Sequence, residues 1–219
     1  MQRRSLSLAV SVALLVALAG ACGSPSSEPA GDGGWKVLFD GKTLAGWTAK
    51  GGHYDGNAAW TVEDGAITGR ETPKREGGLL YTTEKYADFE FECDCKCDWP
   101  FDSGIFVRME PKLRGAQVTI DFRPDGEMCA IYSDGYLMHN PNVMPKFKRD
   151  EWNRLKVRCT GADMHIVTWL NGEQVVDFTI PPGSGEFARE GLIGIQVHGG
   201  SDSPLATKVQ FKNLRAKRL

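Results

Sequence analysis

Polar and aromatic side chains that could bind and act on a ligand share one face of several short alternating stretches. Successive side chains of a β-strand point to opposite faces of its sheet, so the apolar residues of each stretch would face a core and their neighbours would face outward. If the four strands over residues 104–110, 116–123, 127–134 and 192–198 share one sheet, we expect their outward side chains to converge on a site. These side chains are Phe106, Arg108, Gln117, Thr119, Asp121, Tyr132, Asp134, Gln196 and His198, with Glu110 and Arg123 on the same face.

His198 is the strongest candidate for acid–base chemistry in this set. An unperturbed imidazole titrates near neutral pH, and two glycines follow His198 directly, so the backbone there could approach a ligand closely. His139 is a further candidate because it lies in a loop beside the expected site. The alternative is that these polar side chains form the solvated face of an antiparallel sheet. The aromatic Phe106 and Tyr132 among them favour a binding site.

Other catalytic arrangements find little support in the sequence. Sandwich-fold glycosidases can carry a Glu-x-Asp-x-Glu triplet on one strand face, whereas Gln117, Thr119 and Asp121 have the corresponding spacing here. With one acid among the three, a two-carboxylate mechanism is poorly supported. The sequence also lacks a nucleophile-elbow motif and a phosphate-binding loop. No cofactor is indicated; a divalent metal on the same face is an alternative, but no spacing selects one.

Cysteines at alternate positions, Cys93, Cys95 and Cys97, are separated by charged residues. This period of two predicts a strand with its cysteines on the apolar face, and so a core position is favoured over a metal site. Residues i and i+2 of one strand lie about 7 Å apart, too far for a disulfide. A bridge to Cys129 or Cys159 stays open in an oxidising compartment. Because these cysteines are odd in number, at least one thiol stays free.

The elements that must position these residues are short β-strands. Alternating or β-rich runs recur between turn signals, and no segment has a clear helical period. The pattern predicts an all-β domain, a sandwich of two packed antiparallel sheets. Asn171-Gly172 marks the clearest hairpin, because Asn-Gly tolerates the positive φ of a type I′ turn. The predicted strands cover residues 35–39, 60–62, 66–68, 78–82, 87–99, 104–109, 116–122, 127–133, 152–160, 164–170, 174–180, 192–198 and 206–215.

The N-terminus has the pattern of an export signal. Two arginines precede an uncharged apolar run over residues 6–18, and the small residues Ala-Gly-Ala stand directly before Cys22. The apolar run is too short to span a bilayer as a helix. We therefore expect residues 1–21 to be a signal peptide and Cys22 to carry the lipid of a bacterial lipoprotein. Ordinary secretion is the alternative.

The rest of the chain suits one exported domain. Residues 22–34 hold no apolar side chain larger than Ala after Cys22, which predicts a flexible tether, and residues 35–219 have the length of a single sandwich domain. With 26 basic and 28 acidic residues, the formal net charge is −2, and nucleic acid is not an expected partner. We expect the domain to be held at the membrane through a lipid on Cys22, or to be secreted if Cys22 is not acylated.

Six segments, in order along the chain, resemble the 3-keto-disaccharide hydrolase domain family, long catalogued as a domain of unknown function. Each segment is weak alone, but the ordered set spans residues 35–216 and is specific. The segments are VLFDGKTLAGW (37–47), WTVEDGAI (60–67), SGIFVR (103–108), EWN (151–153), WLNG (169–172) and GIQVHG (194–199).

The resemblance implies a concanavalin A-like jelly roll that cleaves glycosides oxidised at C3. A C3 ketone acidifies the C2 proton; a base can remove this proton, the enolate can expel the C1 substituent, and water adds afterwards. Such a site needs a base, an electrophile near the ketone oxygen and an acid for the leaving group. The implied partner is an oxidised oligosaccharide or glycoside. The catalytic candidates are His198 as base or acid, Arg108 at the ketone and Asp121; the substrate-binding candidates are Gln117, Thr119, Gln196, Tyr132, Asp134, Phe106 and His139.

One departure from the family pattern leaves other functions open. Family members commonly carry Glu-x-Gln where this chain has Gln117-x-Thr119, so either Asp121 replaces the missing carboxylate or this branch uses other substrates or only binds them. The competing hypotheses are a lectin-like carbohydrate-binding module without chemistry and a surface protein that engages another protein. A binding module typically exposes a row of aromatics, whereas the segments around Trp60, Trp152 and Trp169 are interpreted as core, which favours the enzyme.

Overall fold

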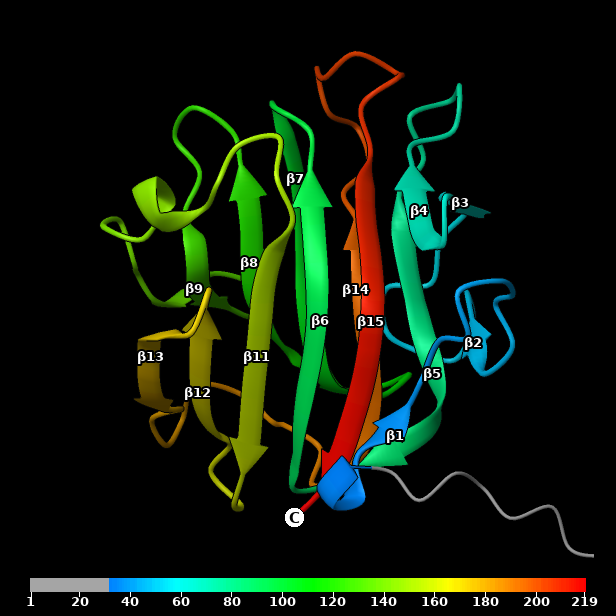
Figure 1. The fold of residues 1–219 in the computed structure, drawn as a ribbon. Coiled ribbons are helices and arrows are strands. Elements are labelled where there is room, and N and C mark those ends of the chain that lie inside the picture. The colour runs from blue at the N-terminus through cyan, green and yellow to red at the C-terminus, as the bar shows by residue number, and fades with distance from the viewer. Residues whose placement is uncertain (1–31) are drawn as a thin grey trace, which may run out of the picture. The chain divides into compact units, whose positions relative to one another are not determined.

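Two antiparallel β-sheets that pack face to face make up the structure, a computed structural model that describes residues 32–219 (Figure 1). The predicted signal peptide, Cys22 and nearly all of the predicted tether lie outside the described residues. Two 3₁₀ turns, Asp32–Gly34 and Met144–Lys146, accompany the strands. Over residues 32–219 there is no helix with the length and apolar character needed to cross a membrane. The predicted all-β sandwich is confirmed.

The first sheet faces the viewer in Figure 1 and has the strand order β13-β12-β11-β6-β15-β4-β3, with β1 paired to β15. β12 and β13 form the predicted hairpin, in which Asn171 and Gly172 have φ of 52° and 88°, as a type I′ turn requires. The strands of this sheet are β1 (Lys36–Val37), β3 (Ala59–Glu63), β4 (Ala66–Arg70), β6 (Phe89–Cys97), β11 (Asn153–Thr160), β12 (His165–Leu170), β13 (Glu173–Thr179) and β15 (Val209–Arg218).

The second sheet lies behind the first in Figure 1 and has the order β10-β9-β8-β7-β14-β5-β2. β14, β7, β8 and β9 are neighbours in this order. The four stretches that carry the predicted polar face therefore share one sheet, which is the condition for their convergence. The strands of this sheet are β2 (Trp47–Thr48), β5 (Gly78–Tyr86), β7 (Phe101–Met109), β8 (Ala116–Phe122), β9 (Met128–Tyr132), β10 (Tyr136–Met138) and β14 (Gly191–Val197).

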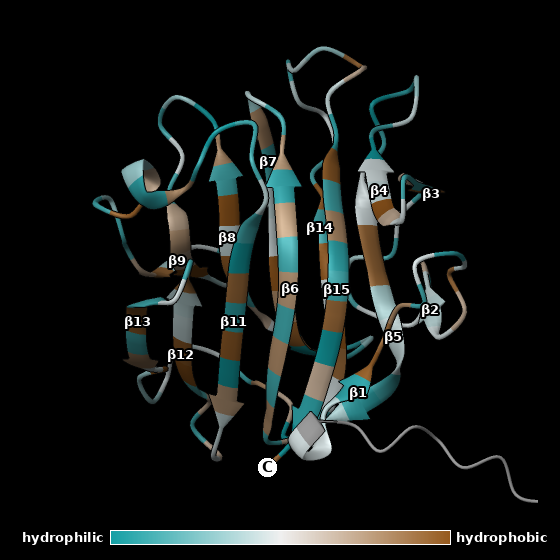
Figure 2. Ribbon diagram, in the orientation of Figure 1, coloured by the Kyte–Doolittle hydropathy of each residue, from teal (hydrophilic) through white to brown (hydrophobic). Residues whose placement is uncertain are grey.

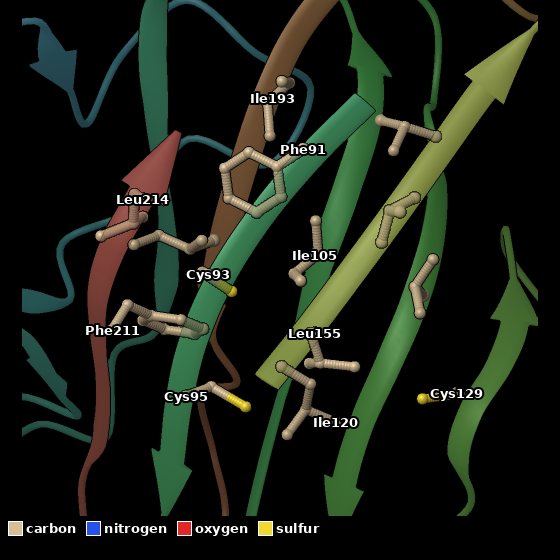
Figure 3. Packing of buried hydrophobic residues seen from close by; sticks show 14 of the residues in the cluster. Phe91, Cys93, Cys95, Ile105, Ile120, Cys129, Leu155, Ile193, Phe211 and Leu214 are labelled. Carbon is tan, nitrogen blue, oxygen red and sulfur yellow. The ribbon is translucent and has the colours of Figure 1, made fainter. Parts of the chain in front are cut away.

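Apolar side chains at alternate positions of both sheets fill the space between them (Figure 3). Leu155 from the first sheet and Ile105 and Ile120 from the second are fully buried in this core. The same alternation appears as teal and brown stripes along β11 and β6 in Figure 2. Burying each such side chain stabilises the fold by roughly 1.5–3 kcal/mol, so the core holds the second sheet with its polar face outward.

The cysteines of the described chain are core residues, as predicted. Cys93, Cys95 and Cys97 lie on the inner face of β6, and Cys129 and Cys159 are also buried; all five are free thiols. Burial raises the pKa of the Cys129 thiol to about 12. These thiols are therefore protonated at neutral pH and pack as small apolar groups.

Two short strands and two tryptophans differ from the sequence-based prediction. The strands β2 and β10 were not predicted, because they are too short to show a period of two. Trp169 and Trp152 are not core residues: the ammonium of Lys156 lies 5.0 Å from the Trp169 ring centroid, and that of Lys212 lies 4.0 Å from the Trp152 ring centroid. Both rings pack beneath cationic side chains, whereas Trp60 does pack against the core.

Candidate active site

A cavity of about 700 Å³ opens on the outer face of the second sheet. Its floor consists of outward side chains of β7, β8 and β14, and the β9–β10 turn and the loop around Tyr54 form part of its walls. The predicted site residues that line this cavity are Phe106, Gln117, Thr119, Asp121, Tyr132, Asp134, Gln196 and His198.

At one end of the cavity, two carboxylates share one guanidinium group. Asp102 on β7 lies opposite Asp121 on β8 in the strand ladder. Arg123 donates from Nε and Nη2 to the two carboxylate oxygens of Asp121, at 2.6 and 2.8 Å. Its Nη2 also lies 3.0 Å from Oδ2 of Asp102. The second acidic residue that the sequence did not reveal is therefore on the neighbouring strand, directly across from Asp121.

His198 stands beside this cluster at the end of β14. Its Nε2 lies 3.9 Å from Oδ2 of Asp102, and its backbone N–H donates to the Asp102 carbonyl at 3.2 Å. The Asp102 side chain is 9% exposed and that of His198 is 46% exposed. The carboxyl of Asp102 is therefore buried next to the imidazole of His198, which is the more exposed of the two groups.

The environment shifts the pKa values of these two groups in opposite directions, up for Asp102 and down for His198. Burial, followed by the charge of Asp121, raises the pKa of Asp102 to about 7, although Arg123 acts in the opposite direction. Burial, followed by the charge of Arg123, lowers the pKa of His198. Near neutral pH, a protonated carboxyl and a neutral imidazole are thus both accessible, which is the pairing that a general acid and a general base need.

A pair of amides forms the centre of the cavity floor. Gln117 Nε2 donates to Gln196 Oε1 at 2.7 Å across the intervening strand β7. This is possible because Gly104 lies between them: a Cβ there would stand 2.1 Å from Gln117 Nε2. The remaining amide groups, Gln117 Oε1 and Gln196 Nε2, have no hydrogen-bond partner within residues 32–219. One acceptor and one donor are therefore available to ligand hydroxyls.

The hydroxyl of Thr119 is instead committed to the fold. It donates to the Glu127 carbonyl at 2.5 Å and accepts from the backbone N–H of Ala130 at 2.9 Å. These bonds lie where the β8–β9 register shifts. Thr119 therefore holds β9 in place, and its hydroxyl is already used by the backbone of that strand and of Glu127.

Aromatic rings form one wall and the rim. The ring centroid of Tyr54 is 5.6 Å from that of Phe106, and those of Tyr132 and Tyr136 are 5.4 Å apart. His139 stacks on Tyr136 at 4.3 Å but does not line the cavity itself. Its Nδ1 lies 2.7 Å from Oε1 of Glu127. The loop position predicted for His139 is correct, but its side chain extends the aromatic rim outward.

Arg108 lies elsewhere, and its predicted place on the polar face is wrong. Its φ of 52° marks a bulge where the β14–β7 register shifts. The bulge reverses the alternation, so Met109 packs with Phe106 on the outer side. Arg108 is 1% exposed. It donates at 2.8 Å each to the carbonyls of Ala87 and Gly161 and to Asp88 Oδ1. Its guanidinium thus joins two turns at the edge of the sandwich.

Several cavity residues were missed by sequence reasoning, chiefly Asp102, Arg123, Tyr54 and Tyr136. Asp102 has the same parity as Phe106, but the predicted strand began at residue 104, three positions after the observed start at Phe101. Arg123 was predicted on the correct face of the sheet, but no function was predicted for it. Tyr54 and Tyr136 are brought in by a loop and by the short strand β10, and neither has a periodic signal in the sequence.

The cluster does not have the form of a metal site. No three His, Cys, Asp or Glu side chains of the described chain are placed to hold a metal ion. The carboxylates of Asp102 and Asp121 already share the Arg123 guanidinium, whose positive charge would repel a divalent cation bound to the same two groups. These residues therefore fit an arginine-centred cluster better than a metal centre.

Comparison with known proteins places most of this chain in one protein family. Residues 34–217 match the family described as 3-keto-alpha-glucoside-1,2-lyase-like domain. A 78-residue segment is 37% identical to a 3-keto-disaccharide hydrolase of Bacteroides thetaiotaomicron; the match covers 33% of this chain and 27% of that protein.

Two solved structures share the fold, with identities that support no more than the fold. A candidate glycosyl hydrolase from Parabacteroides distasonis has a TM-score of 0.62 at 24% identity, over 85% of this chain and 94% of that one. The carbohydrate-binding module CBM66 from Bacillus subtilis has a TM-score of 0.55 at 16% identity, over 78% of this chain and 95% of that one. The predicted jelly-roll sandwich agrees with both.

Proposed function

The chain belongs to the 3-keto-alpha-glucoside-1,2-lyase-like domain family, and we propose that it cleaves glycosides that carry a ketone at C3 of the sugar ring. The observation that carries this proposal is the pairing of Asp102 and His198, 3.9 Å apart, beside the guanidinium of Arg123 in one cavity. Elimination next to a ketone needs a base, an acid and a cationic group. The cluster offers one of each.

His198 is proposed as the base. Since burial lowers its pKa, the imidazole is neutral at pH 7 and can accept a proton. It removes the proton from C2 of the oxidised ring, and the electron pair of that C–H bond delocalises onto the C3 oxygen as an enolate. The acidity that the ketone gives to C2 makes this step accessible to an ordinary imidazole.

Arg123 takes the electrophilic role that sequence reasoning gave to Arg108. Its Nε and Nη2 are held by Asp121, while its Nη1 bonds to no residue within 32–219. A guanidinium fixed in this way is ready to donate to the C3 oxygen as negative charge develops there. Asp121 then acts as a positioning residue, and the amides of Gln117 and Gln196 orient sugar hydroxyls.

Asp102 is proposed as the acid. With a pKa of about 7, a substantial fraction of its carboxyl is protonated at neutral pH. When the enolate collapses, a C1–C2 double bond forms and the C1–O bond breaks. The Asp102 proton goes to the departing oxygen, so a neutral alcohol leaves. Water then adds across the double bond to complete a net hydrolysis.

Incubation of the protein with 3-keto-trehalose and with p-nitrophenyl 3-keto-α-glucoside tests the proposal. We expect release of glucose and of p-nitrophenol, and no release from trehalose or from p-nitrophenyl α-glucoside, because a C3 hydroxyl does not acidify C2. His198→Gln should reduce kcat by about 10²–10⁴-fold, the usual contribution of a general base. Intact 3-keto substrates after long incubation would overturn the proposal.

A carbohydrate-binding module is the second candidate, and the aromatic rim favours it. Tyr136 is 39% exposed and stacks with His139 at the mouth of the cavity, where a sugar ring could lie on it. Saturable binding of 3-keto-trehalose in calorimetry without release of glucose would support this function and exclude the first.

A further inference from the structure

A second cavity of about 470 Å³ adjoins the first at the far end of β7 and β8 from Asp102. Asp102 pairs with Asp121 at one end of these strands, whereas the second cavity is lined by the β7–β8 connection at the other end. The two cavities share Ser133 and Asp134 in their walls. They form neighbouring compartments along one direction of the sheet.

The shared wall is a fixed structure. Asp134 and Gly135 have φ of 57° and 140°, and the N–H of Ser133 donates to the Gly135 carbonyl at 2.8 Å, which closes a tight turn between β9 and β10. Arg114 from the β7–β8 connection forms an ion pair with Asp134 across the boundary. Their side chains are 42% and 67% exposed, so both still present polar groups to a ligand.

The lining of the second cavity suits a neutral ligand that carries hydroxyl groups. Lys112 and Arg114 balance Asp134 and Glu186, so the compartment has no excess of either charge. Phe187 contributes an apolar ring that is partly buried against the core. Polar groups that fix orientation around an apolar surface are typical of small-molecule sites. A sugar unit has this combination, with hydroxyls at its edge and C–H groups on its face.

We infer that the second cavity binds a neutral sugar unit of the leaving group; this inference rests on the proposed function. Asp102 and Phe106 are four residues apart on β7, or about 13 Å at the rise of a strand. A ring held at Asp102 and His198 therefore cannot itself reach the Arg114–Asp134 wall. The substrate must extend along the strands, so the second compartment selects glycosides with a longer leaving group.

The test uses 3-keto-glucosides whose leaving group is p-nitrophenol or a chain of one, two or three glucose units. In the wild type we expect kcat/KM to rise by about tenfold when the chain becomes long enough to fill the second cavity. Phe187→Ala and Lys112→Ala should abolish this rise and leave the p-nitrophenyl substrate unchanged. Lys112 is exposed, so its variant remains informative if Phe187→Ala fails to fold. Lys217→Ala, on the other sheet, is the matched control.

Two outcomes would overturn the inference: a wild-type kcat/KM that does not depend on chain length, or variants that lower it equally for every substrate. Calorimetry with the corresponding C3-hydroxyl oligosaccharides separates this failure from that of the proposed function. One result would retain the subsite but reject the proposed chemistry. In that result no 3-keto substrate is cleaved, the affinity for oligosaccharides rises with chain length, and Phe187→Ala removes this rise. Affinity that is independent of length removes the subsite.

Discussion

Asp102 is a carboxyl whose proton affinity is set by its surroundings. In water it would be ionised at neutral pH, but burial and the nearby Asp121 raise its pKa to about 7. Arg123 limits that rise and bridges the two acids. Because Asp102 and His198 interact, a pH–rate profile reports values that belong to the pair. We expect kcat to fall as the pH rises past about 7, where Asp102 loses its acidic proton.

Asp102→Asn tests the acid role through the leaving group. Asn cannot donate a proton to a departing sugar alkoxide, so we expect kcat for 3-keto-trehalose to fall by about 10²–10⁴-fold. p-Nitrophenolate leaves without protonation, so the same variant should lose much less activity on the aryl substrate. Equal losses on both substrates would assign Asp102 to a step other than protonation of the leaving group.

The same substitution has an opposite consequence for stability. The raised pKa means that native Asp102 holds a proton between about pH 4 and 7 that the unfolded chain has released, so this group's contribution to the free energy of unfolding falls as the pH rises through that window. Asp102→Asn removes the buried charge. We expect the variant to be more stable than the wild type by at least about 1 kcal/mol at pH 8, and the difference to vanish near pH 4. Urea unfolding at both pH values measures it, and a difference independent of pH would contradict the assignment.

At the scale of elements, the bulge at Arg108 joins β7 of the second sheet to two turns, one that connects the sheets and one within the first sheet. Its three hydrogen bonds link β7 to the β5–β6 turn and to the β11–β12 turn at Gly161. A buried guanidinium whose three nitrogen atoms each donate to a protein oxygen supports structure more readily than it polarises a ligand outside its reach. Removal of this guanidinium distinguishes a structural role of Arg108 from a role in the reaction.

Arg108→Met should destabilise the fold while sparing the chemistry. The substitution leaves the carbonyls of Ala87 and Gly161 without their donor, and we expect a loss of roughly 2–4 kcal/mol in the free energy of unfolding. The kcat/KM of the folded protein should stay within about twofold of the wild type. Arg189→Met, at an exposed position, is the control. A loss of activity comparable to that of His198→Gln at unchanged stability would restore Arg108 to the site.

A second link between elements holds the segment that follows His198. The side chain of Glu71, 2% exposed, accepts from the N–H of Ser201 at 2.9 Å and from its hydroxyl at 3.0 Å. Arg75 donates to Glu71 at 2.8 Å, and its carbonyl accepts from Gly200 at 2.7 Å. Glu71 therefore positions the β14–β15 loop, and its negative charge partly offsets the lowering of the His198 pKa by burial and by Arg123.

Glu71→Gln should change the pH profile as well as the rate. Without this negative charge the pKa of His198 falls further, so the acidic limb of kcat/KM should move to lower pH. We also expect kcat to fall by about threefold to tenfold, because the loop loses the carboxylate that binds Arg75. Glu63→Gln breaks an ion pair with Arg70 in the β3–β4 hairpin and serves as the control. If the acidic limb of the kcat/KM profile does not move, Glu71 has a purely structural role.

At the scale of the whole molecule, we propose that the sandwich is anchored to a membrane through a lipid on Cys22, a residue outside the described structure. The full chain can be expressed in a bacterial host, and cell fractionation then tests whether it is anchored. We expect the wild type in the membrane fraction, released by detergent, and Cys22→Ser in the soluble fraction with unchanged kcat. If the wild type is soluble and unlipidated by mass spectrometry, secretion replaces anchoring.

Sequence alone determined the features that depend on local alternation. The period of two placed Cys93 and Cys95 in the core and put Asp121 and His198 on the face of the sheet that carries the cavity. The Asn171-Gly172 turn followed from backbone sterics. These predictions succeeded because side-chain direction in a regular strand follows from position along the chain.

Tertiary structure decided what depends on partners distant in the chain. The bulge at Arg108 arises where β7 meets β14, and it moved that guanidinium to another part of the molecule. Asp102 gained its raised pKa only from burial and from Asp121 across the strand ladder. The second cavity exists because three loops meet beyond the strand ends. Strand order and desolvation are not local properties, so no pattern along the sequence encodes them directly.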